Sequence, residues 1–145
     1  MVNNRIVIDT NVFISALIGQ YSYPYKIFQD LVLTGEVTIC LSNALLSEYE
    51  NVMQREKFKK ITQFSSKALK LIKVVKSLAL RFEPTISINV ITDEPDNRLL
   101  ELAVAANAAV IVTGNTRDFN FDSYQGILIQ SLKFFYESFN LPPSV

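Results

Sequence analysis

Short runs of aliphatic and β-branched residues alternate with segments of helical periodicity along almost the whole chain, and this alternation restricts the fold more than any other feature. Four runs are predicted as strands: residues 5–9, 37–41, 109–113 and 126–129. Strands joined by helices in this order form right-handed crossovers in a parallel sheet. The sequence therefore predicts an α/β fold, a three-layer α/β/α sandwich with a central, mostly parallel sheet.

The helical segments carry apolar residues at spacings of three and four. Helices are predicted over residues 12–17, 26–33, 43 to about 57–60, 65–82, 96–107 and a short stretch from Ser131. The segment 65–82 is predicted to be one basic amphipathic helix. Residues 21–25 are predicted to form a loop.

With 145 residues, 49% of them hydrophobic, the chain suits one domain with a proper core and is too short for two. We expect a single domain over residues 1–140, followed by a short C-terminal tail, residues 141–145. No apolar run approaches the roughly 20 residues of a spanning helix, and Met1 to Arg5 lead into a strand rather than a signal peptide. We therefore expect a soluble, cytoplasmic protein with no membrane association.

Histidine is absent, and Cys40 is the single cysteine. The absence of histidine excludes Ser-His and Cys-His catalytic triads and histidine-ligated zinc sites. Cys40 is predicted to be a small buried apolar residue, and it cannot form a disulfide within the monomer. Hydrolytic chemistry in this chain would therefore depend on carboxylates.

The net charge of zero conceals a separation of charge. Nine of the 14 Lys and Arg residues lie between Arg55 and Arg81 with one acid, Glu56, so this segment carries +8 and the remainder −8. Such separation suits a polyanion bound near a cation-filled pocket. The candidate phosphate contacts are Lys57, Lys59, Lys60, Lys67 and Lys70. An ordinary solvated helix face explains the lysines equally well, because lysines at steps of three wrap around half of a helix.

Four acids are predicted to lie at the carboxyl edge of the sheet, where open parallel sheets bind their ligands. They are Asp9 at the end of the first strand, Glu48 in the helix after the second, Asp96 at the start of the helix before the third, and Asp118 after the third. Glu48 and Glu50 lie on opposite flanks of one apolar helix face, so periodicity does not choose between them.

Each acid also has a plain structural explanation. Asp9 could cap the next helix, Asp96 could complement the helix dipole, and Asp118 could stabilise its own loop. Asp96 differs from a solvated cap, because the residues four and seven positions later belong to the apolar stripe. Its carboxylate is therefore predicted to point inward, where an acid needs a partner.

A cluster of these carboxylates would require a cation. Carboxylates within about 4 Å repel one another by a few kcal/mol at an effective dielectric near 20, and a divalent cation reverses that sign. With oxygen ligands only, the expected ion is Mg²⁺ or Mn²⁺. Such an ion would lower the pKa of a bound water and neutralise charge on a phosphoryl oxygen.

Four segments resemble, in order and spacing, the four acidic motifs of PIN-domain proteins: Asp9–Asn11, Ser42–Arg55, Asp96–Leu99 and Thr113–Phe119. The sequence looks in particular like the small bacterial VapC-like toxins of toxin–antitoxin pairs, which are Mg²⁺- or Mn²⁺-dependent endoribonucleases. This resemblance implies an α/β/α sandwich, an RNA substrate, a cognate antitoxin and a homodimer.

The resemblance also implies roles for the acids. Asp9, Glu48 and Asp96 match the three metal-binding acids, and Asp118 matches the more variable fourth. It is the resemblance alone that favours Glu48 over Glu50. We expect catalysis and metal binding from these four acids.

Four polar residues, Asn11, Ser42, Thr113 and Asn115, are expected to orient the metal ligands or to position water. Many PIN-domain proteins carry a second Asp where this chain has Asn115. A neutral amide therefore replaces an anion there, which puts a second metal site in doubt.

Three functional hypotheses follow. The first is a metal-dependent endoribonuclease, the toxin of a toxin–antitoxin pair. The alternative is a weak or inactive PIN-like module that binds RNA or protein, for which Asn115 is the support. A haloacid-dehalogenase-like or phosphoacceptor protein would need a second acid where Asn11 stands.

The predicted loop over residues 21–25 contains three tyrosines, Tyr21, Tyr23 and Tyr25. They could stack on bases, dock an antitoxin or pack on their own domain, and the last of these is favoured.

Overall fold

The computed structural model describes residues 3–19, 22–119 and 121–140, except for the side chains of Asp118 and Asn140. The expected C-terminal tail, residues 141–145, and Tyr21 lie outside the described residues. The strands are β1 (Arg5–Ile8), β2 (Thr38–Leu41), β3 (Leu80–Arg81), β4 (Val110–Val112), β5 (Ser123–Tyr124) and β6 (Ile127–Gln130). The α-helices are α1 (Thr10–Ile18), α2 (Tyr23–Lys26), α3 (Asn43–Met53), α4 (Glu56–Lys59), α5 (Phe64–Leu78), α6 (Glu94–Ala106) and α7 (Leu132–Asn140).

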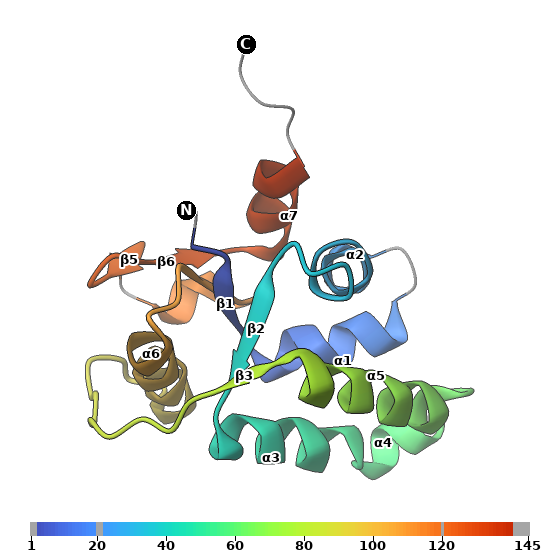
Figure 1. Ribbon diagram of the computed structural model, residues 1–145. Helices are drawn as coiled ribbons and strands as arrows, with labels where there is room; N and C mark the ends of the chain where they lie inside the picture. The colour runs from blue at the N-terminus through green and yellow to red at the C-terminus, as the bar shows by residue number, and fades with distance from the viewer. Residues whose placement is uncertain (1–2, 20–21, 120, 141–145) are drawn as a thin grey trace.

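The strands form one sheet in the order β3-β2-β1-β4-β6-β5, and every pairing is parallel except that of β5 with β6. β1 lies at the centre, with Ile8 opposite Val112 of β4. Figure 1 shows α6 on one side of this sheet and α1, α2 and α5 on the other. The predicted α/β/α sandwich with a mostly parallel sheet is confirmed.

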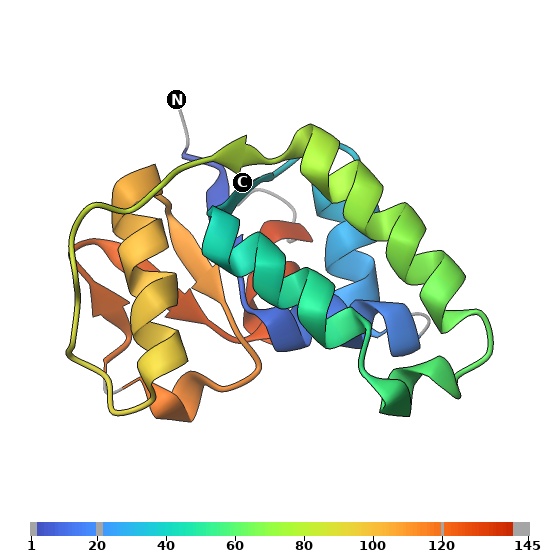
Figure 2. The same ribbon diagram turned by 90° about the horizontal axis from the view of Figure 1, so that it is seen from below.

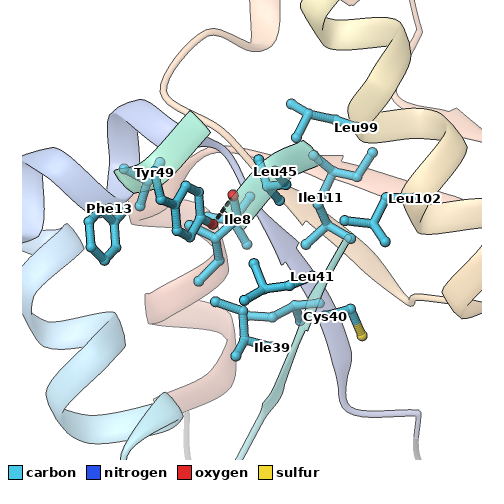
Figure 3. Close-up of a cluster of buried hydrophobic side chains, with 14 of the residues drawn as sticks. Ile8, Phe13, Ile39, Cys40, Leu41, Leu45, Tyr49, Leu99, Leu102 and Ile111 are labelled. Carbon is cyan, nitrogen blue, oxygen red and sulfur yellow. Dashed lines mark hydrogen bonds between the residues drawn. The ribbon is translucent and has the colours of Figure 1, made fainter. Parts of the chain in front are cut away.

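The centre of the core is formed by strand residues, which the apolar faces of the helices cover on both sides of the sheet. Val7, Ile8, Ile111 and Val112 are completely buried. This burial explains why the predicted strands are almost entirely apolar, because helices cover both faces of a parallel sheet. Figure 3 shows the side chains of α3 and α6 meeting those of the central strands. Cys40 is also completely buried, and burial raises the pKa of its thiol to about 11.

The predicted helix over residues 65–82 is too long. α5 ends at Leu78, and Leu80–Arg81 form β3 at the sheet edge, where the Phe82 N–H donates to the Leu41 carbonyl at 2.9 Å. The apolar spacing of α5 continues by coincidence beyond the end of the helix. Residues 80–81 form a strand because they pair with the edge of β2. The predicted helix end at residues 57–60 is also wrong, because α3 ends at Met53 and α4 is a separate short helix.

The predicted loop over residues 21–25 is helical from Tyr23 onward. Ser22 caps α2 by accepting from the Tyr25 N–H at 3.4 Å, and α2 continues into η1, a π-helix over Ile27–Val32. The Tyr23 hydroxyl donates to Glu137 of α7 at 2.7 Å, so this tyrosine packs on its own domain. No described helix is long and apolar enough to cross a membrane.

Candidate active site

Asp9 lies where the central strand β1 becomes helix α1. Its N–H donates to the Val112 carbonyl at 3.1 Å, which extends the pairing with β4 beyond Ile8. Its Oδ2 accepts a hydrogen bond of 3.0 Å from the Thr113 hydroxyl, and that hydroxyl accepts one of 3.0 Å from the Asn115 N–H. The loop after β4 therefore fixes the carboxylate of Asp9 at the carboxyl edge of the sheet.

Asp9 occupies the capping position of α1 but makes only weak contacts with the first N–H groups of that helix. Its backbone is extended, and its side chain makes no capping hydrogen bond to α1. Burial raises the pKa of Asp9 above its usual value. The Thr113 hydroxyl and the N–H groups of Asn11 and Thr10 lower this pKa, but by less than burial raises it. The charge of Asp93 raises the pKa further. Such a carboxylate gains from a cation.

Tyr49 of α3 lies beneath this carboxylate. It is completely buried, stacks on Phe13 of α1 with ring centroids 4.6 Å apart, and donates its hydroxyl hydrogen to the Ile8 carbonyl (Figure 3). Burial, followed by the charges of Asp9 and Glu48, raises the pKa of Tyr49 well above its usual value. The two acids therefore act on the same tyrosine from different elements.

Glu48 and Glu50 have different surroundings in the structure. Glu48 is exposed and lines a groove between α3 and α6, whereas Glu50 lies 3.9 Å from the ammonium group of Lys76 on α5. Helical periodicity could not choose between these two acids, because they flank one apolar face symmetrically. The packing of α3 between α5 and α6 separates them and leaves Glu48 on the side of Asp96.

Asp96 lies in the first turn of α6, yet only 7% of its surface is exposed. The predicted inward direction of this carboxylate is confirmed. Helix α6 starts at Glu94, so Pro95 occupies the second helical position. Asp93, the residue before the helix, is a candidate site residue that the sequence interpretation missed, and the signal was its place three residues before Asp96 in an acidic turn.

Asn97, adjacent to Asp96, holds the chain that leads into this turn. Its side chain is completely buried and accepts from the N–H groups of Val90 and Ile91 at 3.1 and 2.9 Å, while its amide donates to the Ile91 carbonyl at 2.8 Å. One turn later, Glu101 accepts from the Ile88 N–H at 2.7 Å. These bonds fix the position of the acidic turn.

The other predicted site residues in the loops around Asp9 differ in how closely they approach its carboxylate. Asp118 belongs to η2, a 3-10 helix over Thr116–Asp118, and its side chain lies outside the described part. Thr113 contacts Asp9 directly, as expected for an orienting residue. Asn115 and Asn11 are exposed, and each has a backbone N–H directed toward the Asp9–Thr113 pair.

Ser42 has a structural role at the start of α3. It is 5% exposed and caps this helix, since its hydroxyl accepts from the Leu45 N–H at 3.1 Å. We predict that Ser42→Ala lowers the free energy of unfolding by about 1 kcal/mol, because a first-turn N–H loses its partner. Urea denaturation measures this change. Ser42→Asp, which can still cap the helix, is the control, and equal stability of Ser42→Ala and wild type would contradict the prediction.

The predicted phosphate-binding lysines do not line the groove that contains Glu48. Lys67 and Lys70 of α5 border a different groove, of about 350 Å³, against α1 and η1. Lys59 pairs with Glu56 at 3.1 Å, and Lys57 and Lys60 are exposed nearby. Their contact with phosphate stays a prediction.

Among the described side chains, no three acids or cysteines lie close enough to hold a metal ion together, so the three-acid site also stays a prediction.

The family model described as the PIN domain matches residues 5–117, which is most of the chain. The chain belongs to the PIN-domain family. An uncharacterised protein of Methanocaldococcus jannaschii is 33% identical to this PIN domain over 111 residues, which cover 77% of this chain and 70% of that protein.

Two solved structures resemble this PIN domain in fold. VapBC2 from Rickettsia felis, bound to a DNA fragment from its promoter, superposes with a TM-score of 0.54 at 17% identity, over 88% of this chain and 98% of the other. FitAB bound to the IR36 DNA fragment has a TM-score of 0.53 at 15% identity, over 97% and 99% of the two chains. At these identities the likeness concerns the fold.

Proposed function

We propose that this PIN domain is an Mg²⁺- or Mn²⁺-dependent endoribonuclease that hydrolyses RNA phosphodiesters. The observation that carries the proposal is Asp9, a partly buried carboxylate of raised pKa that the loop after β4 fixes at the carboxyl edge of the sheet. PIN domains are usually nucleases, and the other acids lie on two helices or next to them: Glu48 on α3, Asp96 on α6 and Asp93 just before α6.

The donor set suits a hard divalent cation, because it offers carboxylate oxygens and no histidine. Asp9, Glu48 and Asp96 would hold the ion, with Asp118 as a fourth acid. When bound, the ion would lower the pKa of water and neutralise charge on the phosphoryl oxygen. Thr113 would keep one oxygen of Asp9 in a fixed direction through its 3.0 Å hydrogen bond.

We further propose that the protein is the toxin of a toxin–antitoxin pair, acting in the cytoplasm as a homodimer and inhibited by a cognate antitoxin. Support comes from the motif pattern of VapC-like proteins and from the fold shared with VapBC2 and FitAB. Induction of the chain alone should stop growth of a bacterial host, and co-expression of the protein encoded by an adjacent gene should restore it. Normal growth on induction would count against the toxin proposal.

Mn²⁺ is predicted to stabilise the wild-type protein. An ion that binds only the folded state raises its stability by RT ln(1 + [L]/Kd), about 2.7 kcal/mol at a hundredfold excess over Kd. A thermal unfolding series with increasing Mn²⁺, checked by calorimetric titration, measures this shift. Asp96→Asn should lose this Mn²⁺-dependent shift. Glu50→Gln should keep it, because Glu50 lies on the side of α3 that faces Lys76 and not the proposed metal site. An inactive binding module would show no Mn²⁺-dependent shift in any variant.

A further inference from the structure

A groove of about 390 Å³ lies between α3 and α6 and includes Glu48, one of the proposed metal ligands. We call it the α3–α6 groove and define it by Ala44, Leu45 and Glu48 of α3 with Glu94, Pro95, Arg98 and Leu99 of α6. Figure 2, seen from below the sheet, shows the two helices on this side of the molecule. Glu48 belongs both to the groove and to the proposed metal ligands, so the two sites are continuous.

The walls of the α3–α6 groove are aliphatic. Ala44 and Pro95 are exposed, and the buried side chains of Leu45 and Leu99 lie at the groove behind them. A pocket of this size with apolar walls and a few polar groups is typical of a small-molecule or base-binding site. It offers a surface for a flat, neutral group rather than for a phosphate, which the carboxylate of Glu48 would repel.

Arg98 is held rigidly at one side of the groove. Its guanidinium lies 2.6 Å from Glu94 and 2.8 Å from the nearly buried Glu101, and it donates to the Ile88 carbonyl at 3.0 Å. Guanidinium planes stack on unpaired RNA bases, and a guanidinium that is already fixed loses little freedom in doing so. Arg98 also places a positive charge at the groove, which would repel a cationic occupant.

We propose that the α3–α6 groove binds a nucleobase of single-stranded RNA next to the phosphodiester that is cut. The proposal rests on the proposed ribonuclease function and adds to it a base-binding subsite formed by Ala44, Leu99 and Arg98. The base would lie between the aliphatic walls and would stack on the guanidinium plane of Arg98.

The test is to fill the groove and to remove the base. Ala44→Trp places an indole in the groove from the exposed first turn of α3, and Ala44→Leu is a smaller change of the same kind. Asn51→Trp is the control, because Asn51 is exposed on α3 two turns away, outside the groove. The probes are labelled eight-residue RNA homopolymers, and variants of the tightest one with an abasic ribose at each position in turn.

Binding is measured by fluorescence anisotropy in Ca²⁺, and cleavage is measured separately in Mn²⁺. Loss of one stacked base should weaken binding about tenfold. We expect that loss in Ala44→Trp, a smaller loss in Ala44→Leu and none in Asn51→Trp. One abasic position should cost the wild type about tenfold and cost Ala44→Trp nothing more, because both changes remove the same contact.

Two results would overturn the groove proposal: wild-type RNA affinity in a folded Ala44→Trp, or equal affinity for all abasic positions. Either would leave the groove to a protein segment instead. Failure of the proposed function looks different, because the wild type would then cleave none of the RNAs in Mn²⁺, whatever the binding series shows. Unchanged Mn²⁺ stabilisation of Ala44→Trp shows that the metal site is intact.

Discussion

Asp9→Asn is expected to reduce Mn²⁺-dependent RNA cleavage by about a hundredfold or more while making the protein more stable. Removing one group that stabilises transition-state charge typically costs a factor of 10²–10³ in kcat. The amide keeps the shape of the side chain and can still accept from the Thr113 hydroxyl. The loss of activity would therefore come from the missing charge, and it is measured by single-turnover cleavage of a labelled RNA.

The stability gain follows from the raised pKa of Asp9. The folded protein binds the carboxyl proton of Asp9 more tightly than the unfolded chain does. Protonated Asp9 therefore stabilises the fold, and this stabilisation is fully present below the usual pKa of 3.8. It declines as the pH rises from 3.8 through the raised pKa of the folded state, and at neutral pH the buried charge lowers the stability. Asn carries no such charge, so Asp9→Asn should melt at a higher temperature than metal-free wild type at pH 7.

Glu50→Gln is the matched control for this experiment, because it removes an acid of α3 that faces Lys76 rather than the site. It should cleave RNA at the wild-type rate. Wild-type cleavage by Asp9→Asn would show that this acid is outside the active site. A lower melting temperature of Asp9→Asn, with cleavage lost, would mean that the substitution damages the fold instead.

Asn97→Ala is the second change with a large expected effect. It leaves the N–H and carbonyl groups of the buried Ile91, and the N–H of the exposed Val90, without their partner. Each buried polar group left unsatisfied costs about 1–3 kcal/mol. We therefore expect the free energy of unfolding to fall by about 3 kcal/mol or more, as measured by urea denaturation.

The same substitution should loosen the acidic turn. Asn97 fixes residues 90–91, and the turn that follows contains Asp93 and leads to Asp96. Hydrogen exchange of the amides of residues 88–93 should accelerate more than that of β1 amides, and Mn²⁺ affinity should fall. Asn51→Ala, on the exposed face of α3, is the control and should change neither quantity. A stability loss under about 1 kcal/mol would contradict the assigned role of Asn97.

The sequence by itself determined the layered fold and the positions of four strands, β1, β2, β4 and β6. This was predictable because each strand is buried on both faces and each helix has one apolar face, so local periodicity carries the information. It also indicated the inward direction of Asp96, since that residue shares the apolar stripe of α6. The family motifs were readable for the same reason: each is a short local pattern at a strand end or at the start of a helix.

Only the tertiary structure decided the details that depend on contacts between distant segments. The end of α5 was predicted too late, because the edge of β2 and not local spacing makes Leu80–Arg81 a strand. The orientation of Glu48 and Glu50 depends on which helices pack beside α3.

The raised pKa of Asp9 has the same origin. It arises from burial in the assembled fold, with a further contribution from the charge of Asp93, which lies far from Asp9 in the sequence. Periodicity reports which face of an element is buried, but it does not report which partner buries it. The electrostatics of this site are therefore a property of the assembled fold.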